Sequence, residues 1–178
     1  MLIDNAINRA AINHDVIITS GGVSAGEEDH VKAAVEQFGT IHLWRLAIKP
    51  GRPIAFGQLG HSVFVGLPGN PVAAMVTFMI IARPVLLMLM GAKETLVPRY
   101  NVTADFKYNK KVGRREWVRA ILSVRTDPEV VVSKFSTSGA GILTSMVKAD
   151  GLVELAEDVG SVDVGDIVKF LPFSEVTG

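Results

Sequence analysis

The chain opens with hydrophobic residues at helical spacing. An amphipathic helix over Met1–Asn13 is predicted by the recurrence of Leu2, Ile3, Ala6, Ile7, Ala10 and Ala11. No strand comes before this helix, although a parallel α/β sheet usually begins with one. We therefore expect either an unusual start or an internal piece of a longer protein.

Short apolar runs then alternate with a second helical pattern. Val31, Ala34, Val35 and Phe38 lie on one face of a predicted helix over Asp29–Phe38. We expect strands at Val16–Thr19, Ile41–Ile48, Pro53–Phe56 and Ser62–Val65, with a turn at Gly57–His61 joining the last two. This alternation of strand and helix predicts an α/β domain.

Residues Val72–Met90 form a long apolar stretch. Asn70 can cap a helix here and Pro71 can occupy its first position. The pair Arg83-Pro84 is expected to split the stretch into pieces too short to cross roughly 30 Å of hydrocarbon. We therefore predict a buried, kinked helix pair and no membrane segment.

The pattern changes between Gly91 and Pro98. Short β-rich segments follow, punctuated by glycine, aspartate and proline, and Gly139–Lys148 is expected to form a short helix or turn between strands. We predict two domains, an α/β domain over residues 1–94 and a β-domain over residues 97–178.

Composition narrows the classes of function. The 178 residues carry 18 basic and 18 acidic side chains and no cysteine. A near-zero net charge gives no reason to expect nucleic acid as a partner, and the lack of cysteine excludes disulfides, Cys-ligated zinc and thiol catalysis. Polar residues interrupt Met1–His14, so no export signal is visible and a cytoplasmic location is expected.

The stretch Asp15–Asp29 (DVIITSGGVSAGEED) contains the first candidate site. Ser20, Gly21, Gly22, Val23 and Ser24 follow a predicted strand, where backbone N–H groups can converge on an anion. An ordinary glycine-rich turn would have the same composition. The motif alone leaves both readings open.

Three acidic residues follow this turn. Glu27, Glu28 and Asp29 could hold Mg²⁺, which binds a few carboxylates together with waters and ligand phosphates. Acidic residues are also favoured at the start of a helix, where they complement the helix dipole. The triplet alone favours the second explanation.

Two later loops carry further candidates. Lys49 and Arg52 flank a Pro-Gly turn and could both face an oxyanion, or could simply be solvated. Gly66–Pro71 could offer helix-start amides to an anion, or could be a plain helix cap. The four histidines lack the spacing of metal ligands, and we assign them no role.

Together, SGGVSAGEED, AIKPGRP and GLPGNP closely resemble the molybdopterin molybdenumtransferase family, which includes MoeA and the gephyrin E domain. The resemblance is weaker in the β-rich half, through RREWVRA, GAGIL, KADGLVEL and VGDIV. It implies a three-layer α/β molybdopterin-binding domain, truncated at its N-terminus, followed by a small all-β barrel-like domain. The related domain of the molybdopterin adenylyltransferases shares the SGG loop, but the AIKPGRP loop and the β-rich tail argue against it.

The resemblance also implies a reaction and its residues. Molybdate would be inserted into adenylylated molybdopterin with release of AMP, in a Mg²⁺-dependent step. Lys49, Arg52 and Asp29 would be catalytic, with Glu27 and Asp29 holding Mg²⁺. The substrate would contact Ser20, Gly21, Gly22, Val23, Ser24, Pro53, Gly69, Asn70 and Arg119.

Family members are longer, with further domains upstream, so the resemblance implies a C-terminal portion of such an enzyme. One acidic site of the family falls ahead of Met1, and Ala73 and Ala140 stand where many members carry serine. We therefore expect little activity from this portion alone. A homodimer is expected, with a molybdopterin adenylyltransferase as a further partner; the alternative is a non-catalytic molybdopterin-binding or scaffold module.

Overall fold

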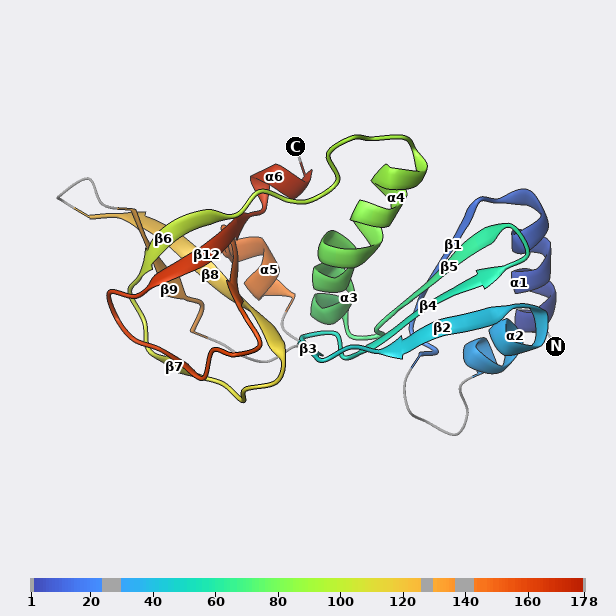
Figure 1. Ribbon diagram of the computed structural model, residues 1–178, viewed down its shortest axis with the longest axis horizontal. Coiled ribbons are helices and arrows are strands. Elements are labelled where there is room, and N and C mark those ends of the chain that lie inside the picture. Colours follow the sequence, from blue (N-terminus) through green and yellow to red (C-terminus); the bar gives the residue numbers. More distant parts are fainter. Residues whose placement is uncertain (1, 24–29, 126–129, 137–142, 178) are drawn as a thin grey trace. The chain divides into compact units, whose positions relative to one another are not determined.

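The computed structural model describes residues 2–23, 30–125, 130–136 and 143–177 (Figure 1). The chain divides into two compact units. The first unit comprises Met1–Leu46 and Gly51–Thr95, and the second comprises Ala47–Pro50 and Leu96–Gly178. The short segment Ala47–Pro50 thus belongs to the unit that otherwise follows it in the chain.

The first unit contains a four-stranded mixed sheet. Its strands, in spatial order, are β1 (Val16–Ser20), β5 (Ser62–Leu67), β4 (Pro53–Leu59) and β2 (Thr40–Arg45). β1 runs parallel to β5, and β4 runs antiparallel to both β5 and β2. The carboxyl ends of β1, β5 and β2 therefore lie at the same edge of the sheet as the amino end of β4.

Helices cover both faces of this sheet, which gives the three layers seen in Figure 1. α1 (Leu2–Asn13) and α2 (His30–Phe38) share one hydrophobic core with strand residues such as Ala55 and Phe64. The opposite core joins Ile54 and Val65 to the helical segments after Pro71. Neighbouring strand residues enter opposite cores because successive side chains of a strand point to opposite faces.

All four predicted strands of the first unit have different ends in the structure, and the differences are largest for β2 and β4. The predicted strand Ile41–Ile48 is confirmed over Ile41–Arg45 and wrong beyond it, because β2 ends at Arg45 and β3 (Ile48–Lys49) pairs with a strand of the second unit. β4 extends to Leu59, through part of the predicted turn. Gly57 marks a close approach of backbones, since a Cβ there would overlap the Thr40 carbonyl of the neighbouring strand.

The predicted split of the long apolar helix is also wrong. α3 (Pro71–Thr77), the π-helical segment η1 (Phe78–Ala82) and α4 (Arg83–Leu89) follow one another without a break. The wider π turn, in which the Arg83 N–H donates to the Phe78 carbonyl, accommodates Pro84 without ending the helix. α4 has no fully buried residue, contrary to the predicted buried helix pair.

By length and apolar composition, this continuous helix meets the criteria for a membrane span. It covers 19 residues, and 33% of its most apolar 18-residue window is buried. Core helices of globular proteins meet the same criteria. The helix therefore gives only weak evidence for a membrane segment.

The second unit is a closed five-stranded barrel. Its strands are β6 (Tyr100–Ala104), β8 (Arg115–Val124), β9 (Val130–Lys134), β10 (Gly151–Leu155) and β12 (Ile167–Pro172). The pairings run β10-β12-β6-β9-β8, and a further pairing of β8 with β10 closes the ring. The predicted fold class, an α/β domain followed by a small barrel, is confirmed.

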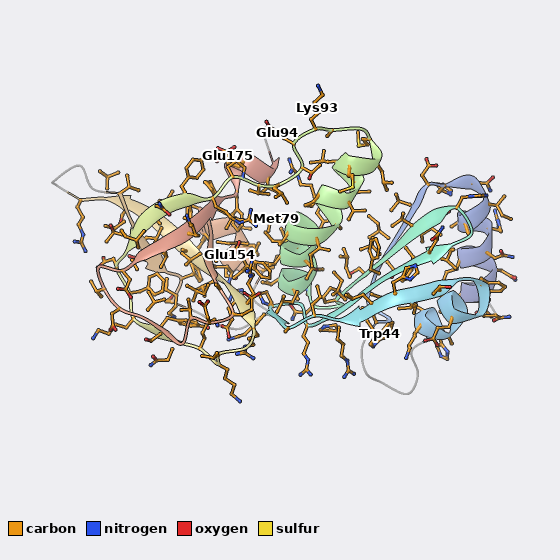
Figure 2. The ribbon with its side chains drawn as sticks, in the orientation of Figure 1. Trp44, Met79, Lys93, Glu94, Glu154 and Glu175 are labelled. Atoms are coloured by element: carbon orange, nitrogen blue, oxygen red, sulfur yellow. The ribbon has the colours of Figure 1, made fainter. Side chains whose placement is uncertain are left out.

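Smaller elements complete the second unit. They are β3, which pairs with the start of β8, the two-stranded sheet of β7 (Tyr108–Asn109) and β11 (Ser161–Val162), and the helices α5 (Thr144–Lys148) and α6 (Ser174–Thr177). On β10, Glu154, which is labelled in Figure 2, binds Arg99 and Arg115 through its two oxygens, each at 2.8 Å. These two ion pairs hold the Glu154 carboxylate between Arg99 and Arg115.

Candidate functional site

Two of the predicted loops come together at the carboxyl edge of the first unit's sheet. The Ser20 hydroxyl donates to the Pro68 carbonyl at 3.3 Å, and the Gly21 N–H donates to the Leu67 carbonyl at 3.0 Å. A Cβ added at Gly69 would lie 3.4 Å from the Gly21 Cα. The SGG turn and the GLPGNP loop therefore form one surface.

Glycine is required at several points of this surface. Gly21 and Gly22 adopt φ values of +85° and +69°, which other residues rarely adopt. Val23, 1% exposed, packs over Gly66, and a Cβ at Gly66 would overlap the Val23 side chain. The conformation of the SGG turn is therefore held by packing against the second loop.

Asn70 caps the long helix at the same edge. Its side-chain oxygen accepts the Ala73 N–H at 3.2 Å, and Pro71 follows in the first turn. The side-chain oxygen of Asn70 is therefore engaged by the cap. The contact agrees with the plain helix-cap reading of the loop.

The edge also carries exposed arginines. Arg52 follows Gly51, whose φ is +99° and whose missing Cβ leaves room for the Thr77 side chain. Pro53 then begins β4 opposite Arg45, the last residue of β2. Arg45 was not predicted as a candidate, because the predicted strand Ile41–Ile48 continues past it; a strand that ends at Arg45 would have placed it at the sheet edge.

Lys49 lies in the second unit, and its ammonium contacts two barrel side chains. Its Nζ donates to Glu116 and to the Tyr108 hydroxyl, each at 3.2 Å. Burial alone would lower the pKa of Lys49, but the hydrogen bonds to Tyr108 and Glu116 outweigh it and raise this pKa. Glu116 and Tyr108 carried no signal in the sequence, being 67 and 59 residues from Lys49 along the chain.

Arg119 lies on β8 of the barrel. Its Nη1 donates to the buried Ser145 hydroxyl at 2.8 Å, and burial lowers the pKa of the guanidinium. Arg119 and Ser145 each have further interactions. The structure therefore shows Arg119 in a partly buried polar environment within its own unit.

Several predicted residues lie outside the described part of the chain: Ser24, Glu27, Glu28, Asp29 and Ala140. Among the described residues, no group of three or more His, Asp or Glu side chains is arranged to hold a metal ion. The predicted Mg²⁺ site therefore stays a prediction.

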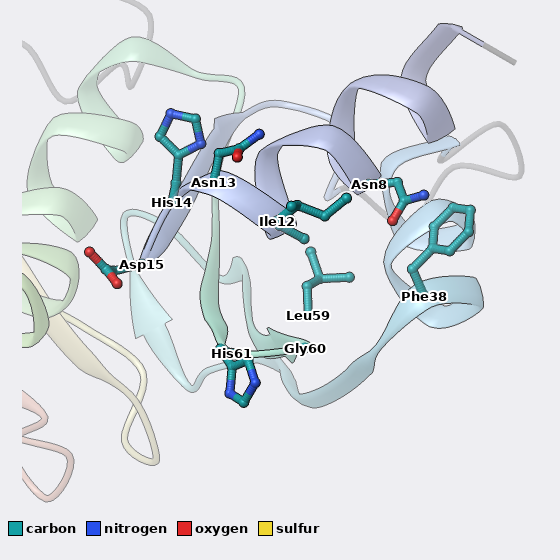
Figure 3. Close-up of a pocket in the computed structure, with 10 residues that line it drawn as sticks. Asn8, Ile12, Asn13, His14, Asp15, Phe38, Leu59, Gly60 and His61 are labelled. Atoms are coloured by element: carbon teal, nitrogen blue, oxygen red, sulfur yellow. The ribbon is translucent and has the colours of Figure 1, made fainter.

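A cavity of about 580 Å³ lies elsewhere on the first unit. It is lined by residues near the ends of α1 and α2 and around the β4–β5 turn, including Asn8, Ile12, Leu59 and His61. Figure 3 shows Ile12 and Leu59 directed toward each other, whereas His61 projects in another direction. Because the amino end of β1 borders this cavity, it lies at the opposite edge of the sheet from the SGG turn.

Comparison with known proteins agrees with this architecture. Residues 1–88 match the family described as "Probable molybdopterin binding domain", and residues 101–173 match the "MoeA C-terminal region (domain IV)". The chain belongs to the molybdopterin molybdenumtransferase family. This result confirms the resemblance drawn from the three loops.

Individual relatives carry related names. The chain is 36% identical over 98% of its length to "Molybdopterin molybdenumtransferase" of Haemophilus influenzae, and covers 44% of that protein. It is 39% identical over 79% of its length to "Molybdenum cofactor synthesis protein cinnamon" of Drosophila melanogaster, covering 24% of it. These names place the family in molybdenum cofactor biosynthesis.

A solved structure titled as the molybdopterin biosynthesis MoeA protein from Pyrococcus horikosii matches 96% of this chain. Its TM-score is 0.75 at 27% identity, and the match covers 40% of that chain. The present chain thus spans less than half the length of these relatives.

Proposed function

We propose that this chain is the part of a molybdenumtransferase that binds adenylylated molybdopterin while molybdate is inserted and AMP is released. The supporting observation is the joining of the SGG turn and the GLPGNP loop at the carboxyl edge of one sheet. Open α/β sheets bind ligands at the carboxyl ends of their strands. Glycine turns allow a phosphate to approach the backbone closely.

In this proposal the substrate phosphates lie against Ser20, Gly21, Gly22 and Gly69. Val23 and Asn70 act by holding the two turns in shape, since Val23 packs over Gly66 and Asn70 caps the helix. These contacts bind and orient the substrate. They do not by themselves transfer charge or protons.

Positive charge is proposed to come from exposed cations. Arg52 and Pro53 lie at the same sheet edge as the glycine turns, and Arg45 lies opposite Pro53. A guanidinium can bind an oxyanion through two parallel hydrogen bonds and stabilises the charge that develops when the bond to AMP breaks. Lys49 and Arg119 are proposed to contribute further cations from the second unit.

Mg²⁺ remains part of the proposal through Glu27 and Asp29. When bound, it would neutralise phosphate charge near the bond that is cleaved. The binding and orienting roles proposed for the described residues do not depend on Mg²⁺.

The test of this site uses a pair of glycine substitutions. Gly69→Ala places a methyl group 3.4 Å from Gly21 without requiring a positive φ, while Gly160→Ala makes a similar contact, 3.5 Å from Val112, in the other unit. Calorimetric titration with adenylylated molybdopterin should show weaker binding for Gly69→Ala and unchanged binding for Gly160→Ala. Equal affinity of both variants and the parent chain would rule out the proposed phosphate surface.

A second pair tests the charge. Arg52→Ala should weaken binding, whereas Arg9→Ala, which removes an exposed arginine from α1, should not. The same titration measures both. Equal losses would mean that general charge, and not a site at Arg52, attracts the substrate.

The proposed setting is a cytoplasmic homodimer that receives its substrate from a molybdopterin adenylyltransferase. A relative of this chain is named "Gephyrin", from Dictyostelium discoideum, and a non-catalytic binding or scaffold module is the second candidate. Saturable substrate binding with no release of AMP would support that second function for the chain alone.

A further inference from the structure

Lys49 is positioned by the backbone pairing of β3 with the barrel strand β8. β3 pairs in parallel with the start of β8, with Ile48 opposite Arg115 and Lys49 opposite Glu116. The Arg115 N–H also donates to the Ala47 carbonyl at 2.9 Å. This pairing sets the Lys49 and Glu116 side chains beside each other.

The Glu116 carboxylate is almost fully buried, and its two oxygens have different partners. Oε1 accepts from Arg114 Nε at 2.7 Å. Oε2 accepts from the Tyr108 hydroxyl at 2.8 Å and from Lys49 Nζ at 3.2 Å. Because Glu116 is 1% exposed, these hydrogen bonds hold the carboxylate in one place.

The Lys49 ammonium is held on one side and open on the other. Two of its three N–H groups donate to Glu116 and Tyr108, and the ammonium also lies 5.8 Å from the centre of the Tyr108 ring. The side chain is nevertheless 48% exposed. The third N–H can therefore be donated to an anion from solvent.

The cluster of Lys49, Arg114, Glu116 and Tyr108 also remains positive. It contains two cations and one carboxylate. A lysine paired with one isolated carboxylate would have its charge cancelled. Here one net positive charge is left for an oxyanion.

We propose that Glu116 is a positioning residue, whose carboxylate holds the Lys49 ammonium in the place and orientation in which it binds an oxyanion of the substrate. The inference rests on the proposed function, because it assumes that Lys49 binds substrate. Tyr108 has a secondary role, since its hydroxyl donates to Glu116 and accepts from Lys49. Neither Glu116 nor Tyr108 touches the substrate in this account.

The experiment measures binding of adenylylated molybdopterin to the full 178-residue chain as a function of pH. Glu116→Gln should weaken binding by about tenfold and move the alkaline loss of binding to lower pH, because the ammonium loses a neighbour that favours its charged form. Tyr108→Phe should also weaken binding and lower the pH at which binding is lost, by smaller amounts than Glu116→Gln. Within the described chain, Glu116 and Tyr108 are the ionisable groups that contact Lys49, and Arg114 contacts Glu116.

The matched control is Glu157→Gln. This substitution also removes one negative charge. Glu157 pairs with Arg115 on β8 at 2.9 Å and does not contact Lys49. The affinity of Glu157→Gln should stay within about twofold of that of the parent chain, as expected for an exposed ion pair. Its alkaline loss of binding should occur at the same pH as in the parent chain. A loss equal to that of Glu116→Gln would show that only the overall charge matters and would overturn the proposal.

Lys49→Ala separates this proposal from the proposed function. If Lys49→Ala loses binding while Glu116→Gln and Tyr108→Phe keep the affinity and pH limit of the parent chain, the positioning role is wrong and the anion role of Lys49 stands. If Lys49→Ala binds normally, the anion role fails, and the positioning role fails with it. Should Glu116→Gln fail to fold, Tyr108→Phe decides between these outcomes.

Discussion

In the first unit, the candidate surface is made mainly of backbone, with Gly21, Gly22 and Gly69 brought together by packing over Gly66. In the second unit, Lys49 is held by side chains, in a cluster around one buried carboxylate. Among the described residues, no side chain pairs with Arg52 of the first unit, whereas Lys49 has two partners. One region depends on close approach, and the other depends on charge.

This difference determines which changes each region can tolerate. A surface built from glycine turns is sensitive to a single added methyl group and is insensitive to pH, because it contains no titrating group. A cluster around a buried carboxylate is sensitive to protonation, and removing one partner leaves the others without their hydrogen bonds. Substitutions can therefore be chosen that affect one region without the other.

The strongest test removes one aromatic ring from each core. Phe64 is 0% exposed in the first unit and Phe170 is 1% exposed in the second. Phe64→Ala and Phe170→Ala should each lower the free energy of unfolding by about 3–5 kcal/mol. Differential scanning calorimetry should show that the transition of the changed unit shifts and that the transition of the other unit does not. If both variants shift a single common transition equally, the two units unfold together and do not respond independently to substitution.

A smaller effect is expected from Glu116. Glu116→Gln should cost about 1.5–3 kcal/mol at neutral pH, the range for hydrogen bonds to a charged group. Burial alone would raise the pKa of Glu116, but the hydrogen bonds from Tyr108, Arg114 and Lys49 outweigh it and lower this pKa. A lowered carboxyl pKa stabilises the fold above the unfolded value and loses that stabilisation as the pH falls through the folded value.

The pH dependence of the free energy of unfolding tests the direction of the pKa shift of Glu116. The parent chain should lose stability as the pH falls below the ordinary carboxyl value of 4.5, and the loss should be smaller in Glu116→Gln. The raised pKa of Lys49 acts at the other end, with its stabilisation lost as the pH rises past 10.5. Parallel acid profiles for the two chains would contradict the role of Glu116 in stability.

The two loops of the first unit could be located from the sequence because their signals are local. The SGG turn and the GLPGNP loop each carry their own glycines, and both follow strands that the apolar pattern locates. Parallel strands end at one edge, so topology alone brings these loops together. Helical spacing likewise located α1 (Leu2–Asn13), which lies within the predicted helix Met1–Asn13 and ends at the predicted residue.

The sequence could not predict the partners of Lys49. β3 is only two residues long, and its pairing with β8 depends on tertiary structure, not on a pattern in the chain. The predicted strand Ile41–Ile48 ran through this point because apolar residues continue past Arg45. The predicted break at Pro84 failed for a similar reason, since a π turn absorbed the proline. Both errors concern backbone geometry that residue type does not specify.

Gly66→Ala should have a smaller effect, confined to the first unit. The added methyl group would overlap Val23 and lie 3.1 Å from the Ala55 Cβ, so the SGG turn must shift. Overpacking of this kind costs about 1–3 kcal/mol. Thermal unfolding measures the loss, with Gly160→Ala as the control, whose midpoint should not move. A stable Gly66→Ala variant with full substrate binding would show that the two loops do not depend on each other.

The smallest effect on stability is expected at the free edge of the sheet. Within the described chain, β1 pairs with β5 on one side and with no strand on the other. Ile18 on this strand is 39% exposed, and an unpaired edge with an exposed apolar residue favours association with another chain. We expect the chain to self-associate at concentrations on the order of tens of micromolar.

Ile18→Lys should shift this equilibrium to monomer while changing stability by no more than about 0.5 kcal/mol, since charged residues block pairing at an edge. Ile121, 38% exposed, lies on β8 within the closed ring of the barrel, so Ile121→Lys gives a matched change at a strand with no free edge. Sedimentation velocity distinguishes them, because only Ile18→Lys should remove the larger species. A parent chain that sediments as a monomer at these concentrations would show that the β1 edge is not an association site.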